Sequence, residues 1–127
     1  MTPEAAEHLD KARQFVNRTR IILAAGVAED AARDAYLAAF HAARALIAER
    51  TSRRVKTHRG VHVQFARLTK DEARLDPELR RFLPHTYDMK AIADYETGPG
   101  AVIPPEQVET AIETATRFVE CVAELLA

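Results

Sequence analysis

One stretch of the chain, residues 29–50, constrains the fold more than any other. It reads EDAARDAYLAAFHAARALIAER, with apolar side chains at helical spacing and alanine on most of the remaining sides. Alanine is the strongest helix former, and a helix that is apolar around most of its girth is buried on several sides. The stretch is therefore predicted to be the central helix of a bundle, or a helix that also packs on a partner chain.

Four further segments have helical periodicity and boundary signals. Thr2 with Pro3 and Asp76 with Pro77 suit helix starts, and Gly26 suits a helix end. The predicted helices cover residues 3–25, 29–50, 61–70, 77–95 and from 104 or 105 to the end, with loops at 51–60 and 96–103.

Pro84 lies inside the fourth predicted helix. A proline there removes one backbone hydrogen bond and clashes with the carbonyl group of Arg80, so a kink or break is expected between these two residues. No segment reads as a strand, and 127 residues suit a single domain spanning 1–127. The predicted fold class is all-α, an up-and-down antiparallel helical bundle of four main helices plus one short helix.

Composition excludes several classes of protein. The net charge of −1 gives no global field toward nucleic acid or membrane. The only cysteine, Cys121, lies in an apolar helical pattern and is predicted to be a buried hydrophobe. No apolar run approaches the ~20 residues of a membrane span, and the polar, acidic N-terminus does not resemble a signal peptide. The sequence therefore predicts a cytoplasmic protein without membrane contact and without a cofactor.

The histidines do not form a metal motif. His58 and His62 are four residues apart, but Arg59 stands where metalloproteases carry glutamate, and no third ligand has a supporting spacing. The TGPG sequence at residues 97–100 lacks the lysine and the strand–loop–helix context of a phosphate loop. Neither a metal site nor a glycine-rich phosphate site is predicted.

A basic patch stands out from the nearly neutral chain. Residues 50–59 contain no acidic side chain and five cations, namely Arg50, Arg53, Arg54, Lys56 and Arg59. Such a patch can hold the phosphate oxygens of RNA or of a nucleotide, although a solvated surface is the alternative. No aromatic residues are interleaved with these cations, so base stacking within the loop is not expected.

A second pattern places Arg80, His85 and Tyr87 close together in the sequence RRFLPHTY. A histidine can take the proton of a ribose 2′-hydroxyl at neutral pH, and an arginine can stabilise the charge on a phosphorane. Arg80 and His85 are therefore a candidate catalytic pair for RNA cleavage. The alternative is that both lie on a partly exposed helix face near the proline.

Three short elements are similar, in order and spacing, to elements of HEPN-domain proteins, the "higher eukaryotes and prokaryotes nucleotide-binding" family. They are ARDAYLAAFHAARALIAER at residues 32–50, KTHRGV at 56–61 and AIADYE at 91–96. The likeness covers nearly the whole chain. It implies an antiparallel helical bundle, usually a homodimer. Many bacterial members are encoded beside a nucleotidyltransferase-fold protein, and some of these pairs are toxin–antitoxin modules.

The resemblance also implies roles for particular residues. Active HEPN toxins are metal-independent endoribonucleases whose arginine and histidine meet across the dimer axis, and Arg80 and His85 match that string. In one group a following tyrosine receives AMP from the antitoxin, which makes Tyr87 a modification candidate. The resemblance also suggests a polar cluster of His41, Lys56, His58, Asp94 and Tyr95. Together with the basic patch, this gives a predicted nucleotide- or RNA-binding face that contains Arg53, Arg54, Lys56, His58 and Arg59.

Within that cluster, Asp94 is expected to face His58, to orient its imidazole and to raise its pKa. His41 has the alternative of a buried or interface histidine. Three functions therefore remain open at this point. They are binding of nucleotide or RNA beside a nucleotidyltransferase-like partner, catalysis as a metal-independent ribonuclease toxin, and a non-catalytic helical interaction module.

Overall fold

The computed structural model describes residues 1–98 and 102–127 and contains five helices and no strand within them. The helices are α1 (Pro3–Ala24), α2 (Ala28–Thr51), α3 (His58–Thr69), α4 (Pro77–Tyr95) and α5 (Pro105–Leu126). The all-α bundle of four long helices and one short helix predicted from the sequence is confirmed. The predicted loop at 96–103 includes residues 99–101, which lie outside the described residues.

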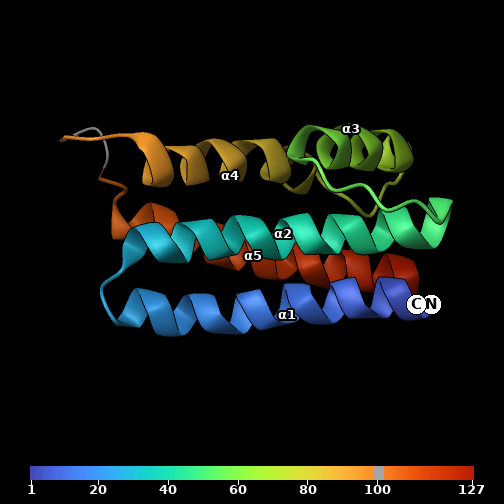
Figure 1. Ribbon diagram of the computed structural model, residues 1–127, viewed down its shortest axis with the longest axis horizontal. Helices are drawn as coiled ribbons and strands as arrows, with labels where there is room; N and C mark the ends of the chain where they lie inside the picture. Colours follow the sequence, from blue (N-terminus) through green and yellow to red (C-terminus); the bar gives the residue numbers. More distant parts are fainter. Residues whose placement is uncertain (99–101) are drawn as a thin grey trace.

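Helix α2 occupies the centre of the bundle (Figure 1). It packs on every other helix, with α1 on one side and α3 and α4 on the opposite side. Its alanines are buried all round the helix, so short side chains let the neighbours approach closely. The predicted central position of this segment is confirmed. The chain runs along α1, back along α2, across it with α4, and back along α5.

Local capping explains where the helices begin. Thr2 Oγ1 accepts a hydrogen bond from the backbone N–H of Ala5 at 3.1 Å, and a carboxylate oxygen of Asp76 accepts from Leu79 at 2.9 Å. Both caps stand directly before a proline, as the sequence predicts. Gly26 follows α1 with a φ of +84°, a left-handed conformation that favours glycine.

The predicted start of the third helix at residue 61 is wrong, because α3 begins about one turn earlier. Thr57 Oγ1 accepts from the N–H of Gly60 at 3.0 Å and caps the helix. A Cβ at position 60 would lie 2.6 Å from that same oxygen, so only glycine fits without displacing the cap. The predicted 51–60 loop therefore shrinks to residues 52–57, and His58 joins His62 on one helix face.

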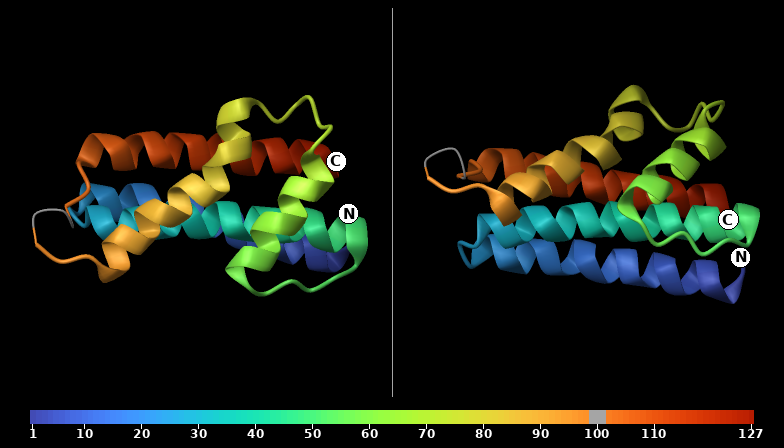
Figure 2. Two further views of the ribbon diagram at one scale, coloured as in Figure 1. Left: turned by 90° about the horizontal axis from the view of Figure 1, so that it is seen from above. Right: turned by 45° about the horizontal axis from the view of Figure 1, so that its top comes forward.

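Helix α4 continues through Pro84 without interruption. Figure 2 shows its first turns set at an angle to the remainder, so a bend rather than a break accommodates the proline. The bend separates the part of α4 beside α3 from the part that runs on over α2.

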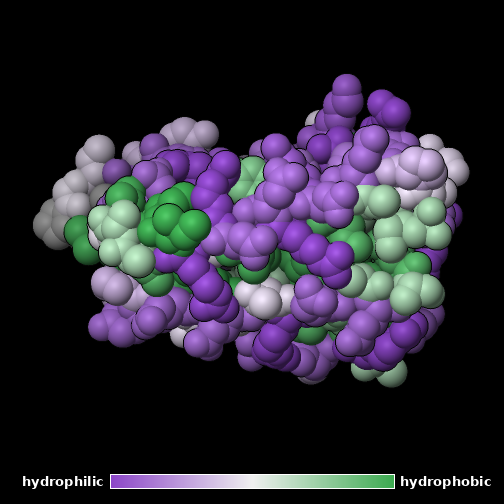
Figure 3. Space-filling view, turned by 90° about the horizontal axis from the view of Figure 1, so that it is seen from below, coloured by the Kyte–Doolittle hydropathy of each residue, from purple (hydrophilic) through white to green (hydrophobic). Residues whose placement is uncertain are grey.

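The surface over α1 is largely hydrophilic, with a hydrophobic area toward the α1–α2 turn (Figure 3). Ile21 and Val27 are exposed apolar residues on either side of that turn. None of the helices in the described ranges combines the length and the apolar character that a membrane crossing requires.

Candidate functional site

The hydroxyl group of Tyr36 lies between two imidazoles on α3. It is 2.7 Å from Nδ1 of His58 and 3.0 Å from Nε2 of His62. Tyr36 itself is fully buried on α2. Because α3 begins at His58, the two histidines stand on successive turns and both reach the same oxygen. A single hydroxyl on the central helix therefore fixes the position of α3.

Tyr87 of α4 completes this arrangement. Its ring centroid lies 5.1 Å from that of Tyr36, 5.2 Å from that of His58 and 5.4 Å from that of His62. The Tyr36 and Tyr87 rings meet edge to face, which suits their quadrupoles. We call Tyr36, His58, His62 and Tyr87 the tyrosine–histidine cluster. It joins α2, α3 and α4 at a partly exposed surface.

Burial favours the uncharged forms of Tyr36, His58 and His62. Burial lowers the pKa of His58, and the nearby Lys90 ammonium lowers it further. Burial also lowers the pKa of His62, with a smaller contribution from His58. The pKa of Tyr36 is raised by burial. A neutral hydroxyl can donate to one imidazole nitrogen and accept from the N–H of the other, so the three groups are mutually satisfied.

A charged group adjoins the cluster on the α4 side. The Asp94 carboxylate pairs with Arg33 of α2 at 2.6 Å and with Lys90 of α4 at 2.6 Å. The hydrogen bond from Lys90 is the main cause that holds the pKa of Asp94 below its ordinary value. The predicted pairing of Asp94 with His58 is therefore wrong. His58 takes Tyr36 as its partner, and its pKa moves down instead of up.

The predicted binding cations lie next to the cluster in the chain. We call Arg53, Arg54, Lys56 and Arg59 the basic segment, and all four side chains are exposed. Arg54 pairs with Glu4 of α1 at 3.1 Å. The segment leads directly into the start of α3, where His58 enters the cluster. Cationic and hydrogen-bonding groups thus share one edge of the molecule.

Comparison with known protein families matches residues 5–125 to the HEPN domain. The chain belongs to the HEPN domain family. A search of curated proteins finds no match. The family membership agrees with the all-α bundle and points to a function related to nucleotides or RNA.

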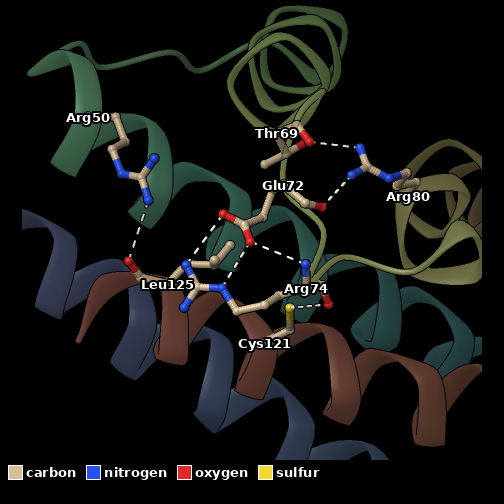
Figure 4. Close-up of polar contacts among 7 residues, drawn as sticks. All are labelled: Arg50, Thr69, Glu72, Arg74, Arg80, Cys121 and Leu125. Atoms are coloured by element: carbon tan, nitrogen blue, oxygen red, sulfur yellow. Dashed lines mark hydrogen bonds and ion pairs between the residues drawn. The ribbon is translucent and has the colours of Figure 1, made fainter.

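In this HEPN domain, Arg80 holds the connection between α3 and α4 (Figure 4). Its Nη1 donates to the carbonyl oxygen of Thr69 at 2.7 Å, and its Nη2 donates to the carbonyl oxygen of Glu72. In the same region Glu72 pairs with Arg74 at 2.9 Å, and the backbone of Arg74 accepts from the buried Cys121 thiol. The guanidinium of Arg80 is therefore occupied by main-chain carbonyl groups.

His85 lies elsewhere on α4, exposed at a groove of about 710 Å³ between α4 and α5. Arg80 is directed at the end of α3, so the chain does not by itself bring the predicted catalytic pair together. Arg81 lines the groove with His85. Arg81 and His85 are four residues apart, a spacing that places two side chains on one face of a helix. Arg80 and His85 are five residues apart, a spacing that does not.

The remaining two predicted site residues, His41 and Tyr95, are not members of the tyrosine–histidine cluster. His41 lies on the α1 side of α2, with its ring stacked on Phe15 at 5.5 Å. Tyr95 stands at the end of α4 with 78% of its surface exposed. The sequence interpretation does not assign Tyr36, His62, Arg33 or Lys90 to the site. The one available signal is the spacing of four residues between His58 and His62, which places two side chains on one face of a helix.

We predict that Tyr36→Phe lowers the free energy of unfolding by about 2 kcal/mol, because two hydrogen bonds to the hydroxyl are lost and imidazole nitrogens lose their partner. Chemical denaturation measures this change. Tyr87→Phe keeps the ring packing and serves as the matched control, with a smaller expected effect. Equal losses in the two variants would contradict the role assigned to the Tyr36 hydroxyl.

We predict that stability falls as the pH drops from about 6.5 to about 4. Burial, assisted by Arg44, His8 and Lys11, lowers the pKa of His41 to about 4. The unfolded chain therefore binds a proton on this residue that the native chain does not, which favours unfolding by up to about 3 kcal/mol. In His41→Gln, denaturation curves across this pH range should show a shallower slope. An unchanged slope would refute the assignment.

We predict that Arg80→Gln lowers the free energy of unfolding by about 2 kcal/mol, because two charge-assisted hydrogen bonds to carbonyl groups disappear. The neighbouring Arg81→Gln changes an exposed side chain and should stay within about 0.5 kcal/mol of the parent. Thermal and urea unfolding of the two variants compare them directly. The same small effect in both would show that Arg80 is dispensable for the fold.

Proposed function

We propose that this HEPN domain binds RNA, or the phosphates of a nucleotide, at the surface formed by the basic segment and the tyrosine–histidine cluster. The main support is their convergence at the start of α3. The exposed cations run directly into His58, and the ring of His58 lies 5.2 Å from that of Tyr87. A phosphate ligand needs cations and hydrogen-bond donors together, and this edge offers both.

The charge distribution supports phosphate binding over metal chemistry here. The cations of the basic segment are exposed, while the imidazoles behind them are held neutral by burial. The cations supply long-range attraction to phosphates. Of the two neutral imidazoles, the one that accepts a hydrogen bond from Tyr36 keeps its N–H on the other ring nitrogen and can donate it to a phosphate. In the described ranges, no three metal-ligating side chains of histidine, cysteine, aspartate or glutamate gather at one point.

The family resemblance supports a wider proposal about assembly. On this proposal the domain is a cytoplasmic homodimer that works beside a nucleotidyltransferase-fold partner in a toxin–antitoxin-type module. Co-expression with such a partner and joint purification would test the pairing, and light scattering of the purified domain would test the dimer.

The alternative of a metal-independent ribonuclease has one specific support, the presence of Arg81 and His85 in the groove between α4 and α5. On that alternative His85 acts as general base, and the arginine beside it is Arg81, because Arg80 is occupied. The binding and catalytic proposals invoke different surfaces of α4, so one set of variants separates them.

The test uses a labelled single-stranded RNA and fluorescence anisotropy at several salt concentrations. We predict that the triple variant Arg53→Gln, Arg54→Gln, Lys56→Gln binds at least tenfold more weakly at low salt. The slope of its log affinity against log salt concentration should fall by the amount expected for the loss of about three phosphate contacts. The matched control removes three cations from α1, at Lys11, Arg13 and Arg20, and should bind like the parent.

Equal affinity of the two triple variants would overturn the proposed surface. Cleavage of the same RNA in EDTA, lost in His85→Ala and retained in the basic-segment variant, would support the ribonuclease instead. Absence of any RNA or nucleotide binding would leave the interaction module as the surviving function.

A further inference from the structure

The C-terminal end of α4 carries an exposed aromatic residue beside the proposed binding surface. Tyr95 has 78% of its surface exposed, the largest value among the exposed large hydrophobic side chains. Tyrosine usually keeps its ring at least partly covered, so such exposure at a helix end invites a functional explanation.

Lys90 connects Tyr95 to the tyrosine–histidine cluster. Its Nζ lies 5.9 Å from the centroid of the Tyr87 ring and 5.9 Å from the centroid of the Tyr95 ring. The ammonium is held in place by Asp94 at 2.6 Å. The cation therefore stands between two aromatic rings, one packed into the cluster and one open to solvent.

The distances trace a continuous surface from the basic segment to Tyr95. His58 follows that segment, its ring is 5.2 Å from Tyr87, and Tyr87 leads through Lys90 to Tyr95. Figure 2, seen from above, shows the start of α3 and the end of α4 on the same side of the molecule. The surface begins with cations and ends with an aromatic ring.

We propose that this surface binds single-stranded RNA, with phosphates on the basic segment and an unpaired base stacked on the Tyr95 ring. The proposal rests on the proposed function and specifies its ligand. Cations that follow the backbone, combined with an open aromatic ring, are the two components of single-strand recognition. Within a duplex each interior base is stacked on both faces and cannot offer a face to Tyr95.

The test measures anisotropy with two labelled RNA oligomers of about 12 nucleotides, a length within single-strand site sizes. One oligomer has all its bases, and the other has abasic residues in the same backbone. We expect Tyr95→Ala to weaken binding of the first about tenfold, to leave the second unchanged, and to keep the salt dependence of the parent.

Two variants control for the change in ring and in exposed apolar surface. Tyr95→Phe keeps the aromatic face and should bind like the parent. Ile21→Ala removes a side chain that is 70% exposed on α1 and should also bind like the parent. A duplex of the same sequence should bind the parent and Tyr95→Ala equally.

Equal binding of the base-containing oligomer by the parent and Tyr95→Ala would overturn the stacking role, while the phosphate surface would stand. Equal losses for the base-containing and abasic oligomers would also overturn it, because the effect would not depend on bases. No binding of either oligomer by the parent would overturn the proposed function itself, together with the stacking role.

Discussion

The whole structure depends on the burial of α2 between its neighbours. A helix in this position has almost no solvent face, so partners within the protein stabilise its polar side chains, although Nδ1 of His41 has none. Asp34 pairs with Arg18 of α1 at 2.9 Å, Arg33 pairs with Asp94 of α4, and Arg50 donates to the carbonyl of Leu125 in α5. The Tyr36 hydroxyl links α2 to α3 through its hydrogen bonds with His58 and His62. Each neighbour is thus fixed to the central helix by a polar contact as well as by apolar packing.

This arrangement explains why the candidate site lies where it does. The contacts to α3 and α4 come from the same stretch of α2, so the two helices converge above Arg33 and Tyr36. Their convergence brings Tyr87 and Lys90 beside His58, although these residues are distant in the sequence. The site therefore results from the polar contacts that side chains of α2 make with α3 and α4.

The sequence was sufficient for features that depend on local physics. The helix caps at Thr2 and Asp76 involve residues only three positions away, and the apolar periodicity of α2 is visible within the helix itself. The three helices that these signals predict are present. The cap at Thr57 was missed because the basic residues around it suggested a loop. That error concealed the first turn of α3 and left His58 outside the helix.

Long-range pairing could not be predicted in the same way. Asp94 had a histidine as its expected partner, but Arg33, some sixty residues earlier, takes that place. Tyr36 lies within the apolar stretch 29–50 that predicts a buried helix, yet nothing in the local pattern assigns a partner to its hydroxyl. Arg80 similarly looked catalytic until the carbonyl groups of Thr69 and Glu72 accounted for its guanidinium.

The capping of α3 has a consequence for the thermodynamics of recognition. The segment of residues 52–57 is anchored at one end by Ser52 in a left-handed conformation and at the other by the Thr57 cap. A short tether fixed at both ends has lost most of its backbone entropy when the protein folds. Its arginines therefore meet a ligand with only side-chain freedom left to lose, and the ordering cost of binding is paid largely in advance.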